Sequence, residues 1–161
     1  MASLTVYIWQ MTSRNVGHAA VSFDNNYVSF WPRGEAKGKD LIKKTQHPGV
    51  MQRSLRDDIR AEGGRMPISV TINNINVEAT TREVERLINE VPQYALLRYN
   101  CSHVVANILK TATDKPQSFK LKPSEYGKLA GQIGGLLNSN FWTPAQVLRY
   151  AQELSNSQHH R

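Results

Sequence analysis

The stretch YNCSHVV, residues 99–105, decides how this chain is interpreted, because it holds the only cysteine among the 161 residues. Apolar side chains follow that cysteine at the spacing of an α-helix: Val104, Val105, Ile108 and Leu109. The spacing predicts a helix that begins at Cys101 and runs to about Ala112. The thiol is therefore expected on the first helical turn.

A thiol on the first turn of a helix lies in a distinctive electrostatic environment. The helix N-terminus carries partial positive charge and free backbone N–H groups. Both favour the thiolate, which is the nucleophilic form of cysteine. A single cysteine forms no disulfide within the chain and no multi-cysteine metal site. Position alone leaves two interpretations open: a nucleophile, or a small buried hydrophobe, as many free cysteines are.

A nucleophilic thiol needs a base, and in proteins that base is usually a histidine. Four of the five histidines are weak candidates: His47, His103, His159 and His160. The first precedes a Pro-Gly turn signal, and the last two lie in a polar C-terminal tail. The histidine two residues after the cysteine points about 200° away from it around a helix. We therefore expect that residue to pack or to cap the helix.

His18 is the remaining candidate for the base. It opens an apolar stretch, residues 18–23, which a turn cluster at 24–26 joins to a β-rich run at 27–31. The pattern predicts a β-hairpin with His18 at the start of its first strand. A lone histidine on a strand is often structural. A strand histidine that faces a cysteine at a helix start, however, has the geometry of a papain-type hydrolase.

The order of these residues, His18 first and Cys101 later, is similar to that of the circularly permuted NlpC-type cysteine hydrolases, which include the lecithin–retinol acyltransferase-like proteins. Residues 17–21 resemble the family's histidine strand, 27–32 its following strand, and 100–105 its Asn-Cys-x-His box. The segment Trp142-Thr143-Pro144 is similar to the C-terminal part of some bacterial toxin-like members. The resemblance implies a permuted papain-like fold with Cys101 and His18 as the catalytic pair.

Members of this family usually orient the base with a third polar residue on the next strand. Strand alternation puts Tyr27, Ser29 and Trp31 on one face, and Val28 and Phe30 on the other. We therefore expect Ser29 to be the third catalytic residue, although its hydroxyl carries no charge with which to stabilise an imidazolium. Two alternatives stay open: a main-chain carbonyl orients the histidine, or the serine simply faces water.

These residue types predict acyl chemistry on a thiol. His18 would take the proton of Cys101, and the thiolate would attack an acyl carbonyl to form a thioester. The backbone N–H of Cys101 would help to hold the oxyanion, and Asn100 would either add a donor or cap the helix. Candidates for lining the substrate site are Tyr99, Tyr7 and Trp31. No metal-ligand spacing is present in the sequence, so we expect neither a metal nor a cofactor.

The chain is basic, with a formal net charge of +7. Many of its cations lie in a glycine-bearing segment, 33–64, which we interpret as a long loop or insertion. The basic residues of its first part are Arg33, Lys37, Lys39, Lys43 and Lys44. Such a segment predicts either contact with an anionic surface or a solvated loop of mixed charge. No nucleic-acid-binding motif is present, so nucleic acid is not an expected partner.

The remaining patterns predict a scaffold of the α+β class, an antiparallel sheet packed against helices with the nucleophile at a helix N-terminus. Alternating runs predict strands at 4–9 and 68–72, and amphipathic or capped segments predict helices over about 78–90, 124–136 and 143–154. We expect one permuted papain-like domain over residues 1–154, followed by a polar tail over 155–161.

Three functions are compatible with these patterns. The favoured one is a cysteine peptidase or amidase of bacterial effector or toxin type, which acts on a peptide, cell-wall or protein amide and has an inhibitor or immunity protein as a partner. The acyltransferase or phospholipase branch would act on a lipid ester. The third is a binding module with a decayed triad, of which Ser29 would be the mark.

The sequence also bears on where the protein is made. No apolar run approaches the ~20 residues of a membrane span. No cleavable signal pattern is present either. We therefore expect synthesis in the cytoplasm, with any export by a dedicated effector route.

Overall fold

The computed structural model describes residues 2–13, 15–33, 48–51, 54–95, 99–121 and 141–159. The strands are β1 (Ser3–Trp9), β2 (His18–Phe23), β3 (Asn26–Val28), β4 (Phe30–Pro32), β5 (Gly49–Met51) and β6 (Ile68–Asn73). The helices are α2 (Leu55–Ala61), α3 (Val77–Asn89), α4 (Cys101–Thr113) and α6 (Pro144–His159). The α+β class is confirmed, as are the helix that starts at Cys101 and the two strands predicted at 4–9 and 68–72.

Four strands form one antiparallel sheet in the order β3-β2-β1-β6, and β4 pairs separately with β5. Side chains alternate between the two faces of a strand. In β1 the residues Leu4, Val6 and Ile8 are therefore buried together on one face. The facing residues of β2 extend this apolar face, because the register pairs Ile8 with Ala19 and Leu4 with Phe23.

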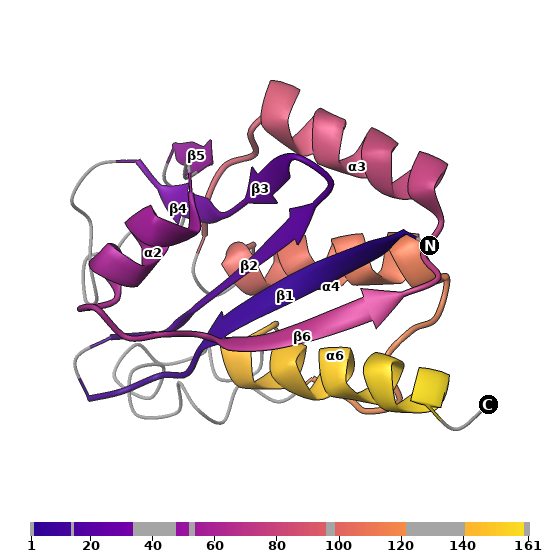
Figure 1. Cartoon of the computed structure of the whole chain (residues 1–161). Coiled ribbons are helices and arrows are strands. Elements are labelled where there is room, and N and C mark those ends of the chain that lie inside the picture. The colour runs from indigo at the N-terminus through magenta and orange to yellow at the C-terminus, as the bar shows by residue number, and fades with distance from the viewer. Residues whose placement is uncertain are drawn as a thin grey trace.

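Helices α4 and α6 pack against the sheet, and α3 packs beside α4 (Figure 1). The four apolar residues of α4 whose spacing predicted the helix are almost fully buried. Full burial of one such side chain is worth about 1.5–3 kcal/mol. The same burial that stabilises α4 therefore also fixes the place of its first residue, Cys101.

One end of the sheet gathers three elements that lie far apart in the sequence. Strand β1 ends where β2 begins, because the two are antiparallel and Trp9 pairs with His18. Helix α2 and the N-terminal end of α4 lie at this same end, on the left of Figure 1. The start of β1 and the end of α6 lie at the other end of the molecule.

Two expectations about chain organisation are wrong. The segment 33–64 is not one long loop, because it contains β5 and α2, and Ser54 caps α2 by accepting a hydrogen bond from the backbone N–H of Asp57. The last helix does not end near Leu154 but continues to His159, so most of the expected polar tail is helical. The helix expected over 124–136 lies outside the described residues. In the part of the chain that is described, no helix is long and apolar enough to span a membrane.

Candidate functional site

His18 is the first residue of β2, and the residue before it explains how the strand can begin there. Gly17 has a φ of 84°, in the left-handed region that favours glycine. A Cβ atom at Gly17 would lie 2.6 Å from the carbonyl oxygen of Trp9. The Gly-His pair therefore lets the chain turn tightly against β1 and enter β2 with the histidine opposite Trp9.

The imidazole of His18 has two oxygen neighbours at one nitrogen. Its Nε2 lies 2.7 Å from Ser29 Oγ and 3.3 Å from Asp58 Oδ2. All three side chains are buried, with a relative exposure of 2% or less. Ser29 donates its only proton to Asp58 Oδ2 over 2.5 Å. Nε2 must therefore carry the hydrogen and donate it, because neither a carboxylate nor a serine that has used its proton can donate to the ring.

Asp58 is held as a carboxylate by a ring of neutral donors. Tyr27 and Ser29 donate to its Oδ2, and Trp31 Nε1 donates to its Oδ1 over 2.8 Å. Burial alone would raise the pKa of Asp58, but its hydrogen bond to His18 and the charge on His18 outweigh burial and lower it. The carboxyl group therefore stays ionised at neutral pH, in the buried position that faces His18.

Cys101 is the first residue of α4, and Asn100 is its N-cap. The side-chain oxygen of Asn100 accepts from the backbone N–H groups of Ser102 and His103, over 2.8 and 3.1 Å, while its Nδ2 donates to the carbonyl of Trp142. Among the described residues, no partner takes the backbone N–H of Cys101, as is usual at the first helical position. That N–H is therefore available to a ligand at the thiol.

Cys101 and Asp58 both act on His18. Burial lowers the pKa of His18, but the charge on Cys101, hydrogen bonding of His18 to Asp58 and Cys101, and the charge of Asp58 raise it to about 10. Because Nε2 points to Ser29 and Asp58, Nδ1 is the nitrogen left for Cys101. His18 is therefore an imidazolium at neutral pH, with the carboxylate of Asp58 beside its Nε2.

Two tryptophan rings flank the same imidazole. The ring of Trp31 is stacked on it, with centroids 4.2 Å apart and planes at 22°. The ring of Trp9 is tilted by 37°, with centroids 5.6 Å apart. Trp31 also donates to Ser29 Oγ over 3.1 Å. It therefore contacts His18, Ser29 and Asp58.

The structure brings some of the predicted site residues to His18 and gives others contacts of a different kind. Ser29 and Trp31 lie against His18, as described above. Tyr99 stacks on His103 and meets Phe30 edge-on. Tyr7 hydrogen-bonds Ser22 and lies beside Tyr27. Asn100 occupies the cap, with its amide N–H committed to a backbone carbonyl.

His103 lies off the thiol, in a capping role. Its Nδ1 accepts from the backbone N–H of Asn100 over 3.3 Å, which completes a capping box. Burial lowers the pKa of His103 to about 4, so the ring is neutral at neutral pH and its Nδ1 can accept. These contacts are the packing and capping that the two-residue offset predicts.

Sequence reasoning missed Asp58, because the segment that contains it was interpreted as loop. A signal was present: Ser54 followed three residues later by Asp57 is a pattern of helix N-termini. Placing a helix there would have drawn attention to a carboxylate on its first turns. The lysines of the basic segment, Lys37, Lys39, Lys43 and Lys44, lie outside the described residues, and Arg33 is exposed.

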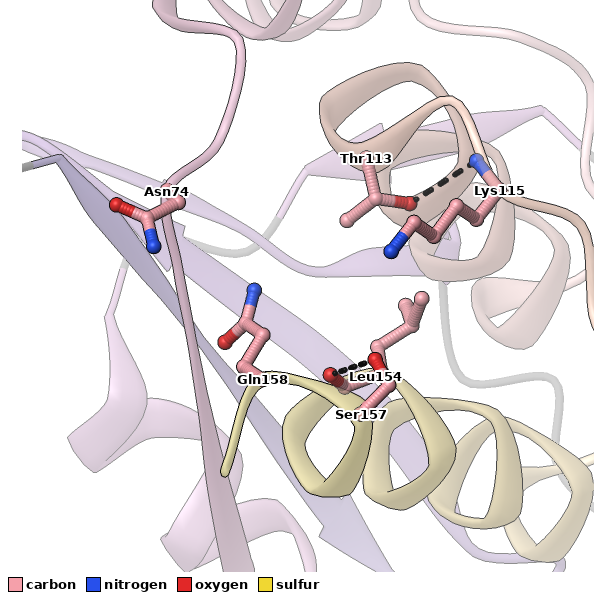
Figure 2. A pocket seen from close by; sticks show the side chains of 6 residues that line it. All are labelled: Asn74, Thr113, Lys115, Leu154, Ser157 and Gln158. Atoms are coloured by element: carbon pink, nitrogen blue, oxygen red, sulfur yellow. Dashed lines mark hydrogen bonds between the residues drawn. The ribbon is translucent and has the colours of Figure 1, made fainter. Parts of the chain in front are cut away.

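A separate cavity of about 160 Å³ lies at the far end of α4 (Figure 2). Its lining residues are Asn74, Thr113, Lys115, Leu154, Ser157 and Gln158. The two hydroxyl groups donate to backbone carbonyls of their own helices, over 2.7 and 2.9 Å. The first and last residues of a 13-residue helix are about 18 Å apart at a rise of 1.5 Å per residue. The cavity is therefore remote from Cys101.

Comparisons with known proteins add no identification. No family model, no curated protein and no solved structure matches the chain. The function of the site is therefore argued from its own geometry.

Proposed function

We propose that this protein is a papain-type cysteine hydrolase that cleaves an amide bond. In this proposal Cys101 is the nucleophile, His18 is the base and acid, and Asp58 fixes His18 with Ser29 as a bridge. One observation carries the proposal: a single buried imidazole contacts a buried, hydrogen-bonded carboxylate, and its pKa responds to that carboxylate and to the lone thiol of the chain. That combination provides a nucleophile, a base and a group that orients the base.

The proposed reaction begins from a pair in which His18 Nδ1 already holds the proton of Cys101, so that the sulfur is a thiolate beside an imidazolium. The thiolate attacks the acyl carbonyl carbon, and the carbonyl π electrons move to oxygen. The backbone N–H of Cys101 donates to this oxyanion at the helix N-terminus. The tetrahedral intermediate then collapses, His18 gives its proton to the leaving amine, and a thioester remains on Cys101. Neutral His18 then takes a proton from water, the hydroxide attacks the thioester carbon, and the carbon–sulfur bond breaks, which releases the carboxylic acid and restores the Cys101 thiolate beside protonated His18.

The charge state of His18 favours an amide over an ester substrate. An amine is a poor leaving group unless it is protonated, so amide cleavage depends on a general acid. With its pKa raised to about 10, His18 keeps its proton through neutral pH and can supply it. An alkoxide leaving group from an ester needs this help less. The similarity of residues 142–144 to toxin-like members makes peptide, protein and cell-wall amides the first substrates to test.

Asp58 also weighs against a decayed binding module. That alternative rested on Ser29, because a serine provides no charge to stabilise an imidazolium. Asp58 provides the charge, 3.3 Å from His18 Nε2 and with Ser29 as a bridge. The carboxylate therefore fills the role that the sequence left without a charged residue.

The test is acyl-enzyme trapping with matched amide and ester substrates. The purified protein would be mixed with peptide amides and with esters of the same acyl group, quenched in acid, and digested for mass spectrometry. We expect an acyl adduct on the peptide that contains Cys101, turnover of the amide, and neither in Cys101→Ala. His103→Gln is the matched control for a change on the same helical turn. A folded wild type that forms no adduct with any acyl donor would contradict the proposal.

A further inference from the structure

A row of aromatic rings crosses the sheet at His18. The register of β1 with β2 pairs Trp9 with His18. The register of β2 with β3 pairs Val21 with Val28, and its continuation by three residues brings Trp31 opposite His18. The strand pairing stops before that point, yet the Trp31 ring is stacked on the imidazole with centroids 4.2 Å apart.

Trp31 is fixed in this place by its own polar atom. Its Nε1 donates to Asp58 Oδ1 over 2.8 Å and to Ser29 Oγ over 3.1 Å. Ser29 then has no lone pair to spare, because it donates once to Asp58 and accepts from Trp31 and from His18. The indole is therefore tied to the two residues that bind His18 Nε2, while its ring face lies on the imidazole.

We infer that Trp31 is a positioning residue for His18. The stacked indole ring fixes the orientation of the imidazole plane, and the ring face and the indole N–H together favour the charged imidazolium. The inference rests on the proposed function, in which His18 must carry and deliver a proton. It differs from the sequence expectation that Trp31 lines the substrate site, because the indole's described contacts are with the catalytic residues themselves.

Two physical effects support this role. A hydrogen bond at Nε2 alone leaves the imidazole free to rotate about the bond direction, and a ring stacked on its face removes that freedom. An indole face also attracts a cation that lies over it. Both effects favour an imidazolium whose Nδ1 points in one direction, which is what proton exchange with Cys101 requires.

The groups that set the charge of His18 come from every element around it. Cys101 on α4 and Asp58 on α2 raise its pKa, and burial lowers it. Tyr27 on β3 acts through its hydrogen bond to Asp58. Burial raises the pKa of the Tyr94 phenol, and the charge on Cys101 raises it further. Tyr94 therefore interacts electrostatically with Cys101. Changes at Trp31 leave all of these groups in the chain.

The experiment is a nuclear magnetic resonance titration of the His18 imidazole in protein with labelled histidine, assigned with His18→Gln. Trp31→Leu removes both the ring face and the N–H, and Trp31→Phe removes only the N–H. The matched control is Trp142→Leu, which removes another buried indole, one that stacks on Tyr150 rather than on His18. Circular dichroism and thermal melting show which variants are folded.

We expect the midpoint of the His18 titration to fall by about one pH unit in Trp31→Leu, a tenfold loss of proton affinity. The midpoint should fall by less in Trp31→Phe, and in Trp142→Leu it should equal that of wild type. On an amide substrate, kcat should fall about 10- to 100-fold in Trp31→Leu with KM nearly unchanged. If Trp31→Leu does not fold, the same comparison is made with Trp31→Phe.

Two results would overturn the inference. One is a folded Trp31→Leu or Trp31→Phe variant with an unchanged His18 midpoint. The other is an equal shift in Trp142→Leu, which would mean that loss of any buried indole has this effect. Failure of the proposed function looks different: wild-type His18 would then titrate near its ordinary value of about 6.5 whatever stands at position 31.

Discussion

Polar side chains from other elements gather near both ends of α4, but the two groups form different kinds of hydrogen bond. At the N-terminal end, His18, Ser29, Asp58 and Trp31 bond to one another and are largely withdrawn from water. At the C-terminal end, the polar groups around the cavity bond mainly to the backbone, as Gln158 does to both the N–H and the carbonyl of Asn73. The first arrangement shifts the pKa values of His18 and Asp58. The second holds helix and strand ends through bonds to backbone atoms.

This contrast shows why a cavity alone is a poor guide to chemistry. Buried titratable groups in contact change each other's pKa, because each must accommodate the charge of the other in a medium of low dielectric constant. Exposed polar groups that bond to backbone atoms have no such effect. Changes at the two ends of α4 should therefore differ in consequence by orders of magnitude.

The largest effect is expected from removing either member of the Cys101–His18 pair. Cys101→Ala and His18→Ala should each abolish amide hydrolysis, because proton transfer and thiolate attack need both. The double variant should be no worse than either single one, since the residues act as a unit. Steady-state assays on folded protein check this. A single variant that keeps wild-type activity would remove that residue from the mechanism.

Asp58→Asn should lower kcat by roughly 10²- to 10⁴-fold, because the buried imidazolium loses its counter-charge and its orientation. Ser29→Ala should lower kcat by a smaller factor. Asp58 Oδ2 already lies 3.3 Å from His18 Nε2, so the carboxylate can act on the imidazole directly when the serine hydroxyl is removed. The comparison of the two variants shows how much of the effect is charge. Equal losses in both would mean that the hydroxyl, not the carboxylate, is the main partner of His18.

The sequence predicted those parts of the site that depend on local pattern. Helical spacing after residue 101 and the Gly-His strand start located the thiol and the imidazole, and alternation selected Ser29. Asp58 was missed, because it reaches His18 only when α2, 40 positions further along the chain, lies beside the start of β2. Its helix is seven residues long and has little apolar stripe, so its pattern was weak beside the glycines and charges around it.

The activity on an amide should persist to alkaline pH. The proton that His18 delivers to the leaving amine is kept up to a pKa of about 10, so kcat should fall only as the pH rises through that region. In Asp58→Asn this alkaline limb should move to lower pH, because Asp58 is one of the groups that raise the pKa of His18. A limb near pH 6.5 in wild type would contradict the assigned charge state.

His103→Gln should leave turnover within about tenfold of wild type, a difference of roughly 1.4 kcal/mol or less. Glutamine can take the place of the histidine in the capping box, and the ring is neutral at neutral pH. A loss of three orders of magnitude in a folded variant would show that His103, and not His18, serves the thiol.

The smallest effect is expected at the far end of α4. Lys115→Gln removes the cation beside the cavity, about 18 Å or more from Cys101 by helix length. Exposed charges at that distance are largely screened by salt. We expect kcat and KM to change by less than about twofold. A larger change would indicate that the cavity communicates with the catalytic end of the helix.

The most direct measurement uses the single cysteine of the chain, because any thiol reagent then reports on Cys101 alone. The rate of alkylation by iodoacetamide would be followed from pH 4 to 10 in wild type, His18→Gln and Asp58→Asn. A thiol paired with the imidazolium should be alkylated at neutral pH faster than an unpaired thiol, because the thiolate is the nucleophilic form. We expect that advantage to disappear in His18→Gln and to shrink in Asp58→Asn. A wild-type rate that simply rises through pH 8–9, unchanged in both variants, would contradict the proposed catalytic pair.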